Sequence, residues 1–141
     1  MCYLVSKIIM MYRKWLNEIK LLDNKTATAS SAAYPIADYE QIMLTLASEN
    51  NGNFTIKVLW SYSDDAPDFS SASDVDNRYY TISVRDLNDG TNIDGDTWIS
   101  LSGTDAVSSY LVNTPGLKWI GVKITTYTAW NCNVWVNGFT S

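Results

Sequence analysis

Acidic and amide side chains gather between residues 86 and 96, where the sequence reads Asp-Leu-Asn-Asp-Gly-Thr-Asn-Ile-Asp-Gly-Asp. Their oxygens are ligands of the kind that calcium prefers. The stretch lacks the alternating ligands and the closing glutamate of an EF-hand loop, and Asp or Asn beside Gly is also typical of tight turns. We therefore expect a plain turn and no cofactor, with calcium as the lesser alternative. The calcium ligands would be Asp86, Asn88, Asp89, Asp94 and Asp96.

A second acidic segment, residues 63–77, carries five aspartates together with several serines. Two chemical interpretations are open: a cation site, or the paired carboxylates of a glycosidase acting as acid and nucleophile. Catalysis by paired carboxylates needs both groups at a fixed separation on a rigid frame, and a serine-rich loop holds them poorly. A solvated loop is the favoured interpretation.

The chain contains no histidine, which excludes Ser-His-Asp and Cys-His nucleophiles and histidine-ligated zinc. No glycine-rich phosphate loop occurs either. Cys2 and Cys132 stand at opposite ends of the chain and form neither a disulfide framework nor a metal motif, which fits synthesis in a reducing cytoplasm. We predict that the protein is not an enzyme.

Charge is divided unequally along the chain. Residues 1–25 carry five basic and two acidic groups, and the remainder carries five basic and thirteen acidic groups. An acidic body argues against nucleic acid as a partner, because phosphate binding needs clustered Lys and Arg. The apolar patch at residues 8–11 is closed by Lys7 and Arg13, far short of the roughly 20 residues that span a membrane. We expect neither a membrane partner nor a signal peptide.

Alternation of apolar and polar residues predicts short β-strands from residue 39 to the end of the chain. The first two strand-like segments, 39–48 and 54–62, flank Asn51-Gly52, a dipeptide typical of hairpin turns, so we expect them to pair. The pattern as a whole predicts an all-β fold, an antiparallel β-sandwich or small jelly roll of about seven to eight strands. The later strand-like segments are 78–87, 96–102, 106–112, 117–127 and 131–140.

The first residues have a different period. Their apolar side chains recur at steps of three and four, which predicts one stripe of an amphipathic helical arm over residues 1–22. Residues 18–22 could equally begin the first strand. Residues 23–38 are then a linker or edge segment, and residues 39–141 the sandwich domain. The stripe consists of Leu4, Ile8, Met11, Trp15, Ile19 and Leu22.

Aromatic side chains lie opposite the aliphatic ones on several strands. Trp119 and Tyr127 alternate with Ile120, Val122 and Ile124; Trp135 and Phe139 alternate with Cys132, Val134 and Val136; and Trp98 faces away from Ile99 and Leu101. If the aliphatic face is the core, the tryptophans lie on a second surface, and a large exposed apolar patch usually marks an interaction site. Three partners could cover this aromatic surface: the helical arm through Trp15 and Ile19, another subunit, or a glycan stacked on the rings.

Three motifs are distinctive in combination: Asp-Asp-Ala-Pro-Asp-Phe at 64–69, Ile-Asp-Gly-Asp at 93–96, and Val-Asn-Thr-Pro-Gly-Leu-Lys-Trp-Ile at 112–120. With them, the region from about residue 21 to 140 resembles small β-sandwich structural proteins in the virions of tailed bacteriophages. The resemblance implies a capsid decoration, head-fibre or tail-associated subunit, usually oligomeric and without catalytic activity. It leaves out residues 1 to about 18, and no functional residue is carried over from it.

We therefore expect a non-enzymatic virion structural protein that is made in the host cytoplasm and assembles by contacts with other virion proteins. A homo-oligomer, with a trimer among the options, would bury apolar area over many symmetric copies. The alternative is a carbohydrate-binding β-sandwich module that mediates surface attachment. The candidate contact residues in both cases are Trp98, Trp119, Trp135, Phe139, Trp15 and Ile19.

Overall fold

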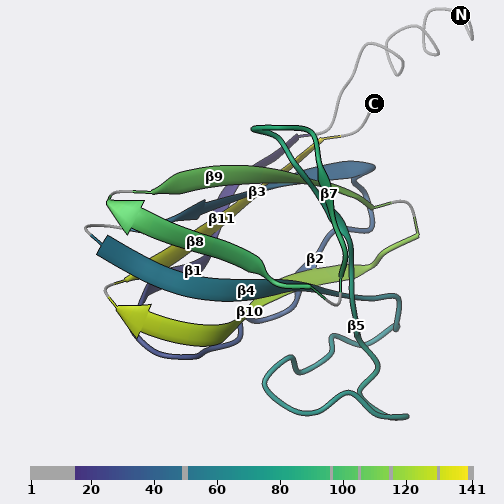
Figure 1. The fold of residues 1–141 in the computed structure, drawn as a ribbon. Helices are drawn as coiled ribbons and strands as arrows, with labels where there is room; N and C mark the ends of the chain where they lie inside the picture. The colour runs from purple at the N-terminus through teal and green to yellow at the C-terminus, as the bar shows by residue number, and fades with distance from the viewer. Residues whose placement is uncertain are drawn as a thin grey trace, which may run out of the picture.

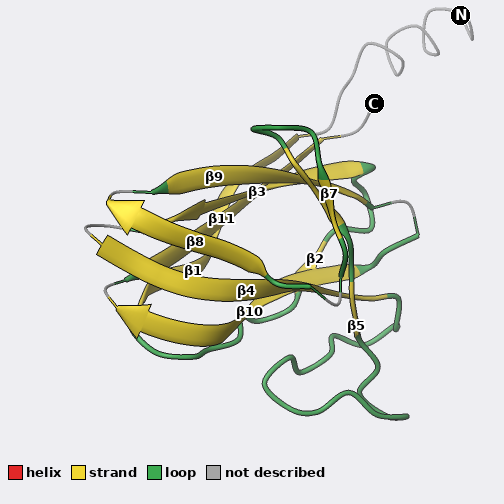
Figure 2. Cartoon of the chain, in the orientation of Figure 1, coloured by secondary structure: helices red, strands yellow, loops and turns green. Residues whose placement is uncertain are grey.

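The computed structural model describes residues 15–48, 51–95, 97–104, 106–114, 116–129 and 131–139. Within these residues the chain forms eleven β-strands and no helix. Figures 1 and 2 show how the labelled strands are arranged. The strands are β1 (Trp15–Lys25), β2 (Tyr34–Pro35), β3 (Gln41–Ala47), β4 (Asn51–Ser61), β5 (Tyr80–Thr81), β6 (Val84–Asp86), β7 (Asn92–Ile93), β8 (Ile99–Thr104), β9 (Val107–Asn113), β10 (Trp119–Ala129) and β11 (Cys132–Phe139).

The strands make two antiparallel sheets that pack face to face (Figure 1). The six-stranded sheet has the order β1-β11-β3-β9-β6-β7. The five-stranded sheet has the order β2-β10-β4-β5, and β8 joins it by pairing with β4. The prediction of an all-β antiparallel sandwich is confirmed, but the described residues form eleven strands where about seven to eight were predicted.

Apolar side chains of alternate residues fill the space between the sheets. On β3, the buried residues Ile42, Leu44 and Leu46 alternate with half-buried ones. Strands β4, β10 and β11 repeat this pattern, and their inward residues form one continuous cluster with those of β3. Such burial contributes roughly 25 cal/mol per Å² of apolar surface removed from water, which makes this cluster the main source of stability.

Residues 15–22 belong to β1 and not to a helix, so the helical prediction is wrong over this part of the arm; residues 1–14 lie outside the described residues. The reason is in the pairing with β11. Ile19 and Leu22 lie opposite Val136 and Val134. Ile19 and Leu22 are three positions apart along the chain, whereas the two valines are only two positions apart. Bulges absorb the extra residues, so inward side chains recur at a helix-like step. The alternative that residues 18–22 begin the first strand is correct.

Strands β3 and β4 follow one another along the chain but do not pair. β3 lies between β11 and β9, whereas β4 lies beside β10 and β8 in the opposite sheet. The predicted hairpin is therefore wrong, and Asn51-Gly52 opens β4 itself. Two neighbouring strands that each have a fully apolar face can bury those faces side by side or across a core, and a turn dipeptide does not distinguish these two arrangements.

Candidate interaction surfaces

The structure separates the tryptophans that were predicted to share a surface. Trp119 lies on β10 of the five-stranded sheet and Trp135 on β11 of the six-stranded sheet, and both alternate with core residues. They therefore lie on the outer faces of opposite sheets. Trp98 directly precedes β8, whose first residue Ile99 is buried, and it is the most exposed of the three at 52%.

Trp119 is in contact with a loop of its own chain. Its Nε1 donates a hydrogen bond to the Ser63 carbonyl oxygen at 2.9 Å. Phe69, from the same loop, is 1% exposed, and a Cβ at Gly121 would overlap the Phe69 ring. The segment between β4 and β5 thus packs on the outer face of the five-stranded sheet. This contact is with neither the N-terminal arm nor another subunit, which were two of the three covers considered.

Polar contacts fix the shape of this loop. Asn77 accepts a hydrogen bond from the Asp68 backbone N–H at Oδ1 and donates one from Nδ2 to the Asp68 carbonyl, each at 2.8 Å. The Asp68 carboxylate accepts hydrogen bonds from the hydroxyl and backbone N–H of Ser70, which hold its pKa below the ordinary value. The loop is therefore exposed to solvent but well defined, with Phe69 as its anchor.

The calcium candidates hold the turn between β6 and β7. The Asp86 carboxylate accepts the Asn88 N–H at 2.8 Å, and Asp89 accepts the N–H and hydroxyl of Thr91. Gly90 has a φ of 77°, a left-handed conformation that suits glycine. Asp94 accepts the Thr97 N–H at its carbonyl, and Asp96 lies outside the described residues. Over the part of the chain that the structure describes, no three Asp, Glu or Cys side chains are grouped to hold a metal.

Trp135 is covered in part by β1. Lys20 pairs with Trp135 across the two strands, and its Nζ lies 5.1 Å from the centre of the ring, a cation–π contact. Ile19 packs on the opposite side, against the core. Trp15 and Phe139 are paired in the β1–β11 register at the end of the sheet, and their side chains lie outside the described part.

An aromatic cluster lies at the end of β4, where Trp60 and Tyr62 continue the alternation of the buried Ile56 and Val58. The Trp60 ring is 5.6 Å from Tyr62 and 5.2 Å from Tyr80, and the two tyrosine rings are 6.2 Å apart and tilted by only 9°. Tyr62 and Tyr80 are 47% and 45% exposed. The period-two face of β4 continues past the core, so its last aromatic residues emerge at the rim. In the sequence, the change from aliphatic side chains to aromatic side chains with a polar group after Val58 was the signal that this face leaves the core.

Arg78 lies close to this cluster. The hydrogen bond and the charge of Lys118 lower the pKa of Asp64, and the positive charge of Arg78 adds a smaller effect in the same direction. The same charge opposes the rise in the pKa of Tyr80, which is caused chiefly by a hydrogen bond with Tyr62. Among the residues that the structure describes, the Arg78 guanidinium has neither a hydrogen-bond partner nor an ion pair.

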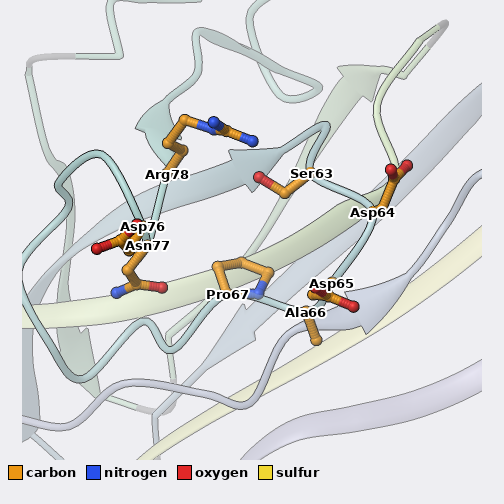
Figure 3. Close-up of a pocket in the computed structure, with 8 residues that line it drawn as sticks. All are labelled: Ser63, Asp64, Asp65, Ala66, Pro67, Asp76, Asn77 and Arg78. Atoms are coloured by element: carbon orange, nitrogen blue, oxygen red, sulfur yellow. The ribbon is translucent and has the colours of Figure 1, made fainter.

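Two hollows open near residues 78–80. The first measures about 190 Å³, and Figure 3 shows Arg78 extending toward Ser63, with Asp64 on the side opposite Asp76 and Asn77. The second measures about 320 Å³ and includes Tyr80 in its wall. The first is lined by Ser63, Asp64, Asp65, Ala66, Pro67, Asp76, Asn77 and Arg78, and the second by Tyr80, Thr81, Ser83, Asp94 and Gly95.

The described residues contain no helix that is long and apolar enough to cross a membrane. No protein-family model matches the chain, and no curated protein matches its sequence.

Two solved structures have a similar fold. The SPBc2 prophage-derived protein YomS superposes with a TM-score of 0.67 and 9% identity, over 92% of this chain and 96% of YomS. The PBSX exported protein XepA superposes with a TM-score of 0.64 and 15% identity, over 91% of this chain but only 38% of XepA. At these identities the likeness establishes the fold alone, and the fold is one found in prophage-encoded proteins.

Proposed function

We propose that this chain is a non-enzymatic structural protein of a phage virion, which assembles with other virion proteins and with copies of itself. The observation that carries the proposal is the fold match to YomS, because it extends over nearly the whole of both chains. YomS is a prophage-derived protein, and XepA is a PBSX protein. A capsid decoration, head-fibre or tail-associated subunit is the particular role that we propose.

The contacts that the aspartate carboxylates make support a structural role. Asp68 and Asp89 accept hydrogen bonds within turns, and Asp64 pairs with Lys118. The pKa values of these three groups are lowered, in each case mainly by the hydrogen bonds that they accept. The acid of a glycosidase needs the opposite shift, a raised pKa that keeps it protonated near neutral pH.

The direct test is mass spectrometry of purified particles from the phage or prophage that encodes this chain. We expect its peptides in particles that have been banded by density, at a fixed ratio to the major capsid or tail proteins. Peptides that occur only in the cell lysate, and never in the banded particles, would contradict the proposal.

The assembly part of the proposal concerns Trp98, a large apolar side chain that is exposed at the start of β8. Burying such a ring in a contact between subunits contributes through the apolar area removed from water. We expect multi-angle light scattering to show a defined oligomer of the full chain, and Trp98→Glu to shift it toward the monomer. Val107→Glu is the matched control, because Val107 is 62% exposed on β9 of the other sheet. A wild-type chain that is monomeric at every concentration would exclude self-assembly of the isolated protein.

A further inference from the structure

Two tyrosine rings lie side by side at the rim of the sandwich. Tyr62 and Tyr80 are nearly parallel and about half exposed, and Trp60 contacts both of them from the inner side. The Trp60 Nε1 donates a hydrogen bond to the Thr81 carbonyl at 3.2 Å, which fixes the tryptophan ring. Because the two tyrosine side chains are already held in place, stacking a ligand on them would cost the protein little side-chain conformational entropy.

The polar groups beside the rings indicate what kind of ligand fits. Arg78 offers unpaired N–H donors in the first hollow, and Ser83 and Asp94 line the second hollow together with Tyr80. A ligand with only apolar surface would bury the Arg78 guanidinium without a partner, which is costly. A pyranose has flat C–H faces for the rings and hydroxyl edges that both donate and accept hydrogen bonds.

Charge distinguishes a neutral sugar from an anionic one. Three aspartates line the first hollow together with a single arginine. Asp64 is paired with Lys118, and Asp65 and Asp76 together outweigh the single charge of Arg78, so the hollow keeps a net negative charge. An anionic ligand would be repelled by this field. One hollow at residue 78 and another at residue 80 leave room for more than one ring of a chain.

We propose that Tyr62 and Tyr80, with Arg78 beside them, form a binding site for a neutral pyranose oligosaccharide. The rings stack on the faces of the sugar, and Arg78 donates hydrogen bonds to its hydroxyls. Trp98 lines neither hollow, so this proposal does not depend on the assembly contact proposed for Trp98.

The test is isothermal titration of the full chain with cellotetraose, maltotetraose and chitotetraose. We expect at least one of them to bind, and the Tyr62→Ala, Tyr80→Ala double variant to lose about tenfold or more in affinity. The double Tyr→Phe variant keeps both rings and should stay within about threefold of wild type. Arg78→Ala should weaken binding, whereas Val107→Ala, a change to an exposed apolar residue on the other sheet, should not.

Folding of each variant is checked by its thermal unfolding midpoint. If the double alanine variant does not fold, Tyr62→Ser alone replaces it, because Tyr62 follows the last residue of β4 and forms no strand pair. The proposal is overturned if none of the three tetrasaccharides binds. It is also overturned if a sugar binds and the removal of the two rings leaves its affinity unchanged. Binding of a decaproline peptide at these rings, with no sugar binding, would also overturn it and assign the site to a peptide.

Discussion

Cys132 shows how burial changes the chemistry of one side chain. It is the first residue of β11, fully buried in the core, and removal from water raises the pKa of its thiol to about 12. In the unfolded chain the thiol ionises near pH 9. A folded pKa above the unfolded one means that the thiol stabilises the fold below pH 9, and that this stability is lost as pH rises from 9 toward 12.

We therefore expect Cys132 to resist Ellman's reagent at pH 8 in the folded protein and to react rapidly in 6 M guanidinium. The measurement uses a Cys2→Ser background, so that a single thiol reports. In the same background, Cys132→Ala should reduce the fall in unfolding free energy between pH 9 and 12, while the tyrosines contribute equally to both proteins. Rapid labelling without denaturant would show that the β11 end opens in the native state.

Single residues differ in how far the sequence could place them. The alternation around Trp119 and Trp135 correctly assigned both to outer faces, because their neighbours are aliphatic. It could not assign them to opposite sheets, since β10 and β11 are joined through only Trp130 and Asn131 and look like one hairpin. Trp60 and Tyr62 share the parity of the core residues, yet Trp60 is half-buried and Tyr62 is exposed, which alternation alone does not reveal.

At the scale of elements, bulges explain the main local errors. A register shift between Ile124 and Thr126 changes the parity of β10, so Tyr127 lies opposite Phe54 and packs against the core. The sequence placed Tyr127 with Trp119 on the outer face. The shifts along β1 likewise produced a helix-like spacing in a strand. A bulge depends on the partner strand, so a period counted along one strand does not reveal it.

The loop between β4 and β5 depends on a missing side chain in β10. Gly121 leaves space for the Phe69 ring, and an alanine there would overlap the ring and also approach the Ser31 hydroxyl. We expect Gly121→Ala to lower the free energy of unfolding by about 1–3 kcal/mol through overpacking. Phe69→Ala should cost about 3–5 kcal/mol because it leaves a cavity.

The double variant tests whether these effects share one contact. With Phe69 removed, the added methyl group has room, so the penalty for Gly121→Ala should shrink by at least about 0.5 kcal/mol. A remainder is expected from Ser31, whose hydroxyl accepts the Val122 N–H at 3.0 Å. Urea unfolding of the four proteins measures the coupling. Fully additive costs would mean that Phe69 does not rest on Gly121 in solution.

At the scale of the whole molecule, the sandwich was predictable because nearly every strand has one aliphatic side. The assignment of strands to sheets was not predictable, since it follows from long-range pairings such as β1 with β11. In this pairing the first described strand, β1, hydrogen-bonds along the last strand, β11, and covers its edge. The fold therefore depends on a segment that the sequence had assigned to an arm outside the domain.

Two truncations test how much the pairing of β1 with β11 contributes to the fold. A chain that begins at Trp15 keeps all of β1, whereas one that begins at Asp23 loses Ile19 and the buried Leu22. The shorter chain uncovers the β11 backbone at Val134 and Val136, and an open apolar edge of this kind favours aggregation. We expect it to aggregate or to melt at least about 10 °C below the longer one in a thermal scan. Equal melting temperatures would show that β1 adds little to the sheet, and that residues 1–22 are an arm outside the sandwich, as the sequence predicted.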